Sequence, residues 1–499
     1  MSNKFGLDLD GAWRRLLREA RGQEVPDVLG WEDHKLRWER WKADIEESLN
    51  NGTYQPHAPL IVERPKDNFA VRPMALLHPI DRVVYEAVVD SMTRQIDKVL
   101  PKEVRSSRLR DPDKLETERQ VRAWLTFQER GRDLYKTQSF EYLLSTDVVS
   151  YFEYIDIGIL ASDLKSLPEV KHDVVDLLSL ILNGFQRSSH VWGLPQGIRA
   201  SSILGNLYML PLDRALEREP DVEYLRYQDD IKVFSDASYK LRRALQRMNR
   251  ALRGRHLNLS VHKTKMVEGP AILDEFEDLR KDAIQYGLRI STPGVKDDLR
   301  RLFDDAVAQS PPATRDIRFA IYRLAQLEDP HAVPWILEHL SEIPYLAEQL
   351  VDYLSVLVPT NAAIEERVRS YLSNENENLY PWVEMQLLRM LARAPKISDE
   401  TYTCGWKILE DERKENLARQ YAARCLGRHI RPGDVASLKD AFTAQGDFWL
   451  RRALLVAIAD AEAQAGAVDK AWFGTVAATD TELEATAKFL RSATTLPEP

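Results

Sequence analysis

The sequence of 499 residues has few cysteines and no long apolar run. Its two cysteines, Cys404 and Cys425, are too few for a disulfide framework or for a four-ligand zinc site made of cysteine alone. No segment approaches the roughly 18 consecutive apolar residues that a membrane span needs. Residues 1–5 do not resemble a secretory signal. We therefore expect a cytoplasmic protein that has no membrane partner.

A surplus of positive charge is also lacking. Residues 1–270 contain 42 Lys and Arg against 41 Asp and Glu, a net charge of +1. Residues 271–499 contain 27 against 37, a net charge of −10, and the two parts sum to the −9 of the whole chain. Proteins that clamp a long nucleic-acid duplex usually carry a clear basic surplus. The charge balance argues mildly against tight duplex binding, although local basic patches stay compatible with it.

The pattern of apolar residues changes along the chain. Residues 1–50 have the pattern of polar helices rich in Trp and Arg, and residues 51–270 mix short apolar strands with helices, which predicts an α+β domain. Residues 271–499 contain only amphipathic helical segments. Similar segments recur at spacings of 32 to 36 residues, which predicts a HEAT-like helical-repeat domain. An irregular all-α domain is the alternative. The recurring segments begin near Arg318, Leu350, Val383, Arg419 and Arg452.

Three segments in the α+β part carry acidic or Gly-rich motifs. Asp147 follows the strand-forming run Leu-Leu-Ser-Thr, and Asp229 and Asp230 lie between two β-forming runs. Between them, residues 193–197 read Gly-Leu-Pro-Gln-Gly and precede a helical pattern. Each motif alone is common in loops and turns. Their joint occurrence in this order indicates one composite site.

Chemistry gives a reason for carboxylates in this arrangement. Phosphoryl transfer to a hydroxyl is often served by two cations about 4 Å apart. Magnesium prefers carboxylate oxygens, and adjacent carboxylates repel one another unless cations compensate their charge. We therefore expect Asp147, Asp229 and Asp230 to be catalytic and to hold two Mg²⁺ ions.

These motifs resemble those of the reverse transcriptase family. Asp147 resembles the first catalytic aspartate of the family, and residues 227–230, Tyr-Gln-Asp-Asp, resemble its Tyr-x-Asp-Asp signature. The segment 193–197, which includes Gln196 and Gly197, resembles its substrate-positioning loop. The resemblance covers roughly residues 45–270. It implies a palm and fingers fold and an RNA-directed type of DNA polymerase, a nucleotidyltransferase that uses deoxynucleoside triphosphates.

The same resemblance implies roles for further residues. It makes Phe152 a steric gate against ribose, Lys66 and Arg72 contacts of the incoming triphosphate, and Lys263 a proton donor to the leaving pyrophosphate. Alone, Phe152 would equally fit a core aromatic, and Lys66 or Arg72 a surface charge. The remaining implied residues are Val148, with the metal ligands, and Tyr227, with the substrate.

Two departures from the common family pattern narrow the resemblance. Residues 198–202, Ile-Arg-Ala-Ser-Ser, lack both prolines of the family's Ser-Pro-x-Ser-Pro run, which contacts the templating base. Residues 271–499 do not resemble the usual thumb. The combination resembles the abortive-infection reverse transcriptases of bacteria, of the AbiK and AbiA type, often carried on prophages. That resemblance implies antiphage defence, a homo-oligomer (trimer or hexamer), and untemplated DNA synthesis primed by a tyrosine, so that the DNA stays covalently attached to the protein.

Some alternatives stay open. An ordinary template-copying reverse transcriptase and a non-catalytic scaffold or sensor with a palm fold are the rival functions, and the intact aspartates argue against the second. None of the 18 tyrosines is singled out as the primer. An arginine-rich run over residues 242–255 would line a product channel, dock on the acidic helical part, or form a solvated face.

Overall fold

The computed structural model describes residues 3–19, 25–35, 37–138, 140–276, 278–290, 292, 294–493 and 496–498. The chain folds into two compact units, each made of three chain segments. The first unit comprises Met1–Glu24, Arg40–Ile61 and Ala75–Asp278. The second unit comprises Val25–Glu39, Val62–Met74 and Leu279–Pro499.

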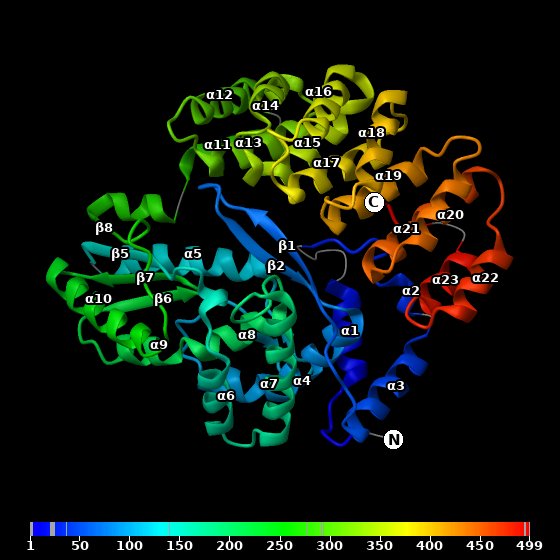
Figure 1. The fold of residues 1–499 in the computed structure, drawn as a ribbon. Coiled ribbons are helices and arrows are strands. Elements are labelled where there is room, and N and C mark those ends of the chain that lie inside the picture. The colour runs from blue at the N-terminus through cyan, green and yellow to red at the C-terminus, as the bar shows by residue number, and fades with distance from the viewer. Residues whose placement is uncertain are drawn as a thin grey trace. The chain divides into compact units, whose positions relative to one another are not determined.

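A four-stranded antiparallel sheet lies in the first unit (Figure 1). Its strands follow the order β6-β7-β5-β8, so the strand that ends in Asp147 lies between its two antiparallel neighbours β7 and β8. In this register Asp147 lies opposite Asp230, which also pairs with Tyr227 on the other side. The strands are β5 (Tyr142–Asp147), β6 (Glu223–Tyr227), β7 (Asp230–Ser235) and β8 (Lys265–Glu268).

Helices cover both faces of this sheet. Helix α5 (Gln120–Thr137) and the 3₁₀ helix η3 (Gly269–Glu275) pack on one face, and α9 (Leu210–Glu217) and α10 (Ser238–Arg253) pack on the other. Helix α10 buries an apolar stripe at helical spacing and exposes its arginines. The core on the α5 face consists of Phe127, Leu134, Leu143, Leu225, Phe234, Ile272 and Phe276.

The rest of the first unit is a group of helices around α4 (Pro79–Val99), which contacts α1, α7 and α8. Proline at the first position suits a helix start, because the missing N–H would have no helical partner. The other elements are α1 (Leu9–Glu19), α3 (Trp38–Asn51), β3 (Leu109–Asp111), β4 (Glu116–Thr117), η2 (Tyr151–Tyr154), α6 (Ile157–Ser166), α7 (His172–Ser189) and α8 (Arg199–Tyr208).

In its described residues the second unit is helical apart from one hairpin, β1 (Leu60–Pro65) and β2 (Val71–Leu76), most of which belongs to it. Its elements after the hairpin are all helical. Together with α2 (Glu32–Lys35), they are α11 (Leu279–Ile290), α12 (Val295–Val307), α13 (Thr314–Gln326), η4 (Pro330–Ala332), α14 (Val333–His339), η5 (Pro344–Leu346), α15 (Ala347–Leu357), η6 (Val358–Thr360), α16 (Ala362–Ser373), α17 (Pro381–Arg393), α18 (Asp399–Glu410), α19 (Asn416–Arg428), α20 (Val435–Ala444), α21 (Phe448–Gln464), α22 (Lys470–Thr479) and α23 (Glu484–Ser492).

Alternate helices of the second unit form a row. Helices α13, α15, α17, α19 and α21 each pack on the next, while α14, α16 and α18 pack on one another in chain order (Figure 1). Stacked helix pairs give this pattern of contacts. The predicted order of an α+β part followed by an all-helical C-terminal part is confirmed. The HEAT-like repeat character of the helices in the second unit stays a prediction.

Two short segments from the N-terminal half join the helical unit. Asp33 lies against α21, where Arg452 Nη2 is 2.9 Å from its Oδ1, and Thr486 donates a 2.7 Å hydrogen bond to its Oδ2. In the hairpin, Arg64 forms a 2.7 Å ion pair with Glu348. The predicted domain limits at residues 50 and 270 stay predictions. The two compact units do not follow the chain order, since residues 25–39 and 62–74 group with the helical unit. Among the described helices, none is long and apolar enough to cross a bilayer.

Candidate active site

Three aspartates lie at one end of the sheet in the first unit. Asp147 ends β5, Asp230 begins β7 opposite it, and Asp229 occupies the turn between β6 and β7. The turn has two residues, and Gln228 adopts a left-handed conformation with φ of 53°. Tight hairpins need such a conformation because it matches the twist of the flanking strands. The turn therefore presents Asp229 beside the end of β5.

The electrostatics of this cluster are those of crowded like charges. Asp229 is partly buried, and this burial together with the neighbouring Asp147 carboxylate raises its pKa to about 7. Two carboxylates in contact resist simultaneous ionisation. A divalent cation with a preference for oxygen ligands would remove this penalty. The donor set of Asp147, Asp229 and Asp230, with Val148 next in the chain, therefore fits magnesium.

Lys263 lies at the same site. Its Nζ forms an ion pair with Asp147 Oδ2. The segment that carries it runs beside the end of β5, where Ser260 N donates a 2.7 Å hydrogen bond to the carbonyl oxygen of Asp147 and Asn258 O accepts one of 2.9 Å from Val149 N. The structure brings Lys263 to Asp147, and its role as a proton donor stays a prediction.

The Gly-Leu-Pro-Gln-Gly loop packs against the chain that follows β5. Leu194 N donates a 2.9 Å hydrogen bond to the carbonyl oxygen of Phe152. Gly193, at φ of 71°, lies so close that a Cβ atom there would be 2.0 Å from the same oxygen. The half-buried Phe152 ring packs on Tyr151, with centroids 4.8 Å apart. Phe152 and this loop therefore form one local structure.

The end of the loop leads directly into α8. Gln196 is buried, and its carbonyl oxygen accepts a 3.4 Å hydrogen bond from Ala75 N, whereas Gly197 is exposed at φ of 81°. Arg199 then starts α8 and forms an ion pair with Asp90 on α4. The stretch without prolines is thus the anchored start of a helix.

A buried network beneath the Asp229 turn was not foreseen from the sequence. Arg226 donates hydrogen bonds of 2.8 and 2.6 Å to the two carboxylate oxygens of Asp213, and one of 2.9 Å to Asn206 Oδ1. It also donates a 2.9 Å bond to the carbonyl oxygen of Gln228, whose N–H donates to Ser106 Oγ at 2.8 Å. A charged residue inside a strand-forming run was the only sequence signal of this network.

The remaining predicted site residues belong to other elements of the fold. Tyr227 packs on Trp124 and donates a 3.2 Å hydrogen bond to the carbonyl oxygen of Gln120, so it is held against α5. Lys66 and Arg72 belong to the hairpin of the second unit, where Lys66 N closes the turn and Arg72 is exposed on β2. Their contacts with substrate stay predictions.

The arginine-rich run is partly engaged within the first unit. Arg243 and Arg247 both form ion pairs with Glu219, and Arg255 makes two hydrogen bonds, of 2.7 and 3.2 Å, to Asp163. Such pairing accounts for half of the run. The other three arginines, Arg242, Arg250 and Arg253, are exposed, as are Arg243 and Arg247.

Residues 64–306 match the family model described as reverse transcriptase (RNA-dependent DNA polymerase). This part of the chain therefore belongs to the reverse transcriptase family, as the motifs around Asp147 and Asp229 predicted, and the match extends past residue 270. No curated protein matches the sequence.

Several telomerase structures are similar to the chain at low scores. Telomerase of Candida albicans, in complex with a TWJ fragment of telomeric RNA, has 10% identity and a TM-score of 0.31, and the alignment covers 76% of this chain and 70% of that one. Apo telomerase of Candida tropicalis has 11% identity and a TM-score of 0.32, with coverages of 86% and 76%. The family assignment is based on the match of residues 64–306 and not on these structures.

Proposed function

We propose that this reverse transcriptase-family chain is a magnesium-dependent enzyme that polymerises deoxynucleotides. The convergence of Asp147, Asp229 and Asp230 carries the proposal, because the crowded carboxylates form a site for divalent cations. When bound, magnesium would activate the attacking hydroxyl and offset the charge of the leaving pyrophosphate.

The side chains around the aspartates have complementary tasks in this proposal. Lys263, beside Asp147, gives a proton to the leaving pyrophosphate. Phe152, next to the Gly-Leu-Pro-Gln-Gly loop, limits the room at the sugar of the incoming nucleotide. Lys66 and Arg72 hold its phosphates as cations. Arg226 supports the Asp229 turn from below through Gln228.

We further propose that synthesis needs no template and starts on a tyrosine of the protein, in a phage-defence role. The resemblance to abortive-infection reverse transcriptases is the source of this proposal, and of a HEAT-like second unit and a trimer or hexamer. Two features support it. Residues 198–202 begin a helix whose Ala200 and Ser201 are buried, which withdraws them from a templating base, and the first 270 residues carry almost no net charge.

Exposure narrows the choice of the priming tyrosine. A primer that reaches the cation site from the protein surface needs an exposed hydroxyl, which excludes buried tyrosines such as Tyr54. Among the 18 tyrosines, four have side chains more than half exposed. These are Tyr154, Tyr239, Tyr286 and Tyr322.

The test incubates the purified chain with labelled deoxynucleotides and magnesium, without primer or template, and separates products on a denaturing gel with and without protease. We expect label that migrates with the protein, shifts after proteolysis, and disappears in Asp229→Asn. The matched control is Asp236→Asn, an exposed aspartate just beyond the end of β7, which should keep the activity. Phenylalanine variants of the four exposed tyrosines then identify the primer.

A template-copying reverse transcriptase is the second candidate, favoured by the matched family's description as an RNA-dependent DNA polymerase. In that case label appears only after a primer–template is added, and it never migrates with the protein. A chain that stays silent under both conditions would contradict both proposals and leave a non-catalytic scaffold.

A further inference from the structure

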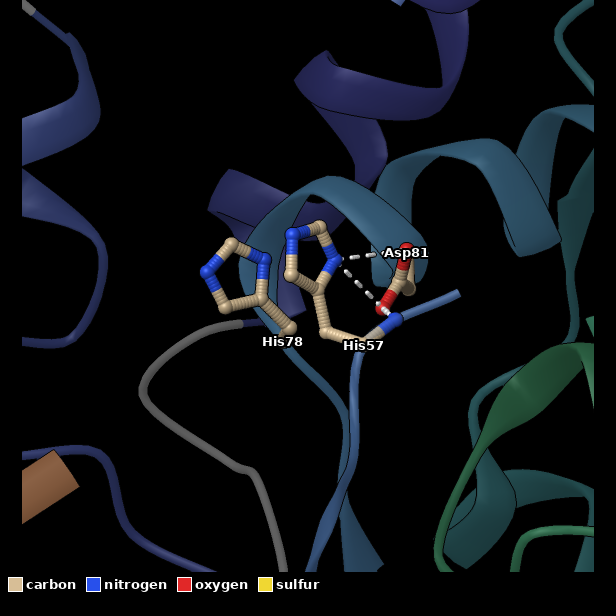
Figure 2. A group of neighbouring side chains, drawn as sticks. All are labelled: His57, His78 and Asp81. Carbon is tan, nitrogen blue, oxygen red and sulfur yellow. Dashed lines mark hydrogen bonds and ion pairs between the residues drawn. The ribbon is translucent and has the colours of Figure 1, made fainter. Parts of the chain in front are cut away.

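A second cluster of metal-binding side chains lies in the first unit, apart from the three aspartates in sequence. His57, His78 and Asp81 each offer one ligand atom, and these atoms all lie within 4.8 Å of one another (Figure 2). His57 Nδ1 is 3.1 Å from Asp81 Oδ2. The two imidazole rings stack, with centroids 4.0 Å apart and an interplanar angle of 22°. Two nitrogen ligands and one carboxylate thus face a common volume.

Their places in the chain suggest what a cation there would hold together. His57 precedes β1 by a short stretch, and His78 follows β2 as the residue before α4. Asp81 lies in the first turn of α4. The two histidines therefore flank the β1–β2 hairpin in sequence, and the aspartate ties both of its ends to a long buried helix.

We propose that His57, His78 and Asp81 bind a transition-metal cation, and that zinc fits best. Zinc takes imidazole nitrogen and carboxylate oxygen at about 2.0–2.2 Å, so tetrahedral ligand atoms lie roughly 3.4 Å apart. The present spread of 4.8 Å closes to this value by small rotations of exposed or half-exposed imidazoles. Magnesium prefers all-oxygen ligands, so this site differs in chemistry from the aspartate site.

Hydrogen bonds already orient the carboxylate. Asp81 is 3% exposed, Tyr54 donates a 2.8 Å hydrogen bond to its Oδ1, and the backbone N of His57 donates one of 2.7 Å to its Oδ2. Metal sites commonly use such an outer layer of hydrogen bonds to fix their ligands. The His57 side chain is 41% exposed, which leaves an entry path and room for water as a fourth ligand.

The helix dipole acts against a cation at this place, since the N-terminus of α4 carries partial positive charge. The Asp81 carboxylate in the first turn offsets that field with a full negative charge. The imidazoles must be neutral to bind, so binding will weaken as they protonate in acid. The expected effect of the cation is to fix the two chain ends that lead into the hairpin carrying Lys66 and Arg72.

The test measures zinc bound to the full-length chain after dialysis against zinc and then against zinc-free buffer with excess magnesium. We expect about one zinc per chain in the wild type and in Asp147→Asn, which weakens any contribution of the aspartate site. His57→Gln and His78→Gln should each weaken zinc binding at least about 10-fold. His172→Gln changes an exposed histidine at the start of α7 and should leave it unchanged.

Cobalt(II) in place of zinc gives a second readout that needs no variant. A four-coordinate site with histidine ligands should show visible ligand-field bands and shifted signals of the bound imidazole protons. Wild-type protein that retains no zinc and gives no such cobalt spectrum overturns the proposal. Zinc binding that His57→Gln and His78→Gln leave unchanged also overturns it. The result does not depend on polymerase activity.

Discussion

Two aspartates, one in each unit, show opposite electrostatics. Asp33 in the second unit is fully buried, which by itself raises the pKa of its carboxyl. The Arg452 guanidinium more than offsets this burial and holds the pKa well below its usual range. Asp229 in the first unit is partly buried beside Asp147, and its pKa is raised to about 7. The first aspartate is compensated within the protein, and the second is crowded by like charge.

This contrast separates structural charge from functional charge. A buried carboxylate with a matched guanidinium fixes chain segments, as Asp33 and Arg452 fix residues 25–39 to the helical unit. The first unit contains a similar pair, because Arg226 and Asp213 are both fully buried and form an ion pair beneath the Asp229 turn. At the aspartate cluster Lys263 pairs with Asp147 and Lys232 lies 3.6 Å from Asp230, yet the pKa of Asp229 is still raised, so the geometry also suits a cation from outside the chain.

We expect the largest effect from replacing Asp229, and we expect it on activity. Asp229→Asn should reduce nucleotide incorporation by at least about 10³-fold, because it removes several kcal/mol of cation-based stabilisation of the transition state. Its melting temperature without metal should stay the same or rise, since a like-charge contact is relieved. Parallel incorporation assays and thermal melts check both parts. A large loss of stability in Asp229→Asn would contradict the view that like charge crowds Asp229 in the metal-free protein.

Replacing Arg452, which compensates Asp33, should lower the stability of the protein, whereas Asp229→Asn should not. Arg452→Leu leaves Asp33 and Asp27 without their buried cation and should destabilise the second unit by about 3–5 kcal/mol. Urea denaturation followed by circular dichroism measures this change. An unchanged unfolding midpoint would contradict the structural role that we assign to the pair.

Acid should weaken the same region through His34. Burial lowers the pKa of His34 to about 4 from the usual 6.5, and Asp33 and Asp27 oppose this shift less strongly. The unfolded chain therefore binds a proton that the folded chain rejects, so stability falls as pH drops from about 6.5 to about 4. The total is about 3 kcal/mol. Urea midpoints over this range should fall in the wild type and fall less in His34→Phe. Parallel slopes in the two proteins would exclude His34 as the cause.

The smallest expected effect comes from an exposed ion pair in the second unit. Arg413 lies 2.9 Å from Asp411, but its side chain is 80% exposed. Solvent screens such pairs, so Arg413→Leu should leave the unfolding midpoint unchanged. Together with Arg452→Leu, this variant shows whether burial or ion pairing as such decides stability. A loss of stability comparable to that of Arg452→Leu would contradict the view that burial decides how much an ion pair stabilises this protein.

Local patterns in the sequence predicted the main strands and helices of the fold. The strand that ends in Asp147, the strands on either side of Asp229 and the helices after residue 279 follow from short-range periodicity, and the structure contains all of them. The catalytic and substrate roles of the predicted site residues stay predictions. Their spacing and the family motif supported them without any knowledge of contacts.

Long-range contacts were beyond the reach of such patterns. Arg226 contacts Asp213 and Asn206, which lie 13 and 20 positions away, and Gln228 in the adjoining turn bonds Ser106, which lies 122 positions away. These residues show no shared motif. For the same reason the attachment of residues 25–39 to the helical unit was not foreseen. The meeting of His57 with Asp81 also depends on how the chain returns after the hairpin.

The central claim is that crowded carboxylates at Asp147, Asp229 and Asp230 hold divalent cations. Titration of the full-length chain with Mn²⁺, a close analogue of Mg²⁺ in its oxygen ligands, monitored by electron paramagnetic resonance, tests it most directly. We predict Mn²⁺ binding that Asp229→Asn weakens strongly and that Asp236→Asn leaves intact. Equal Mn²⁺ binding by the wild type and Asp229→Asn would contradict the account.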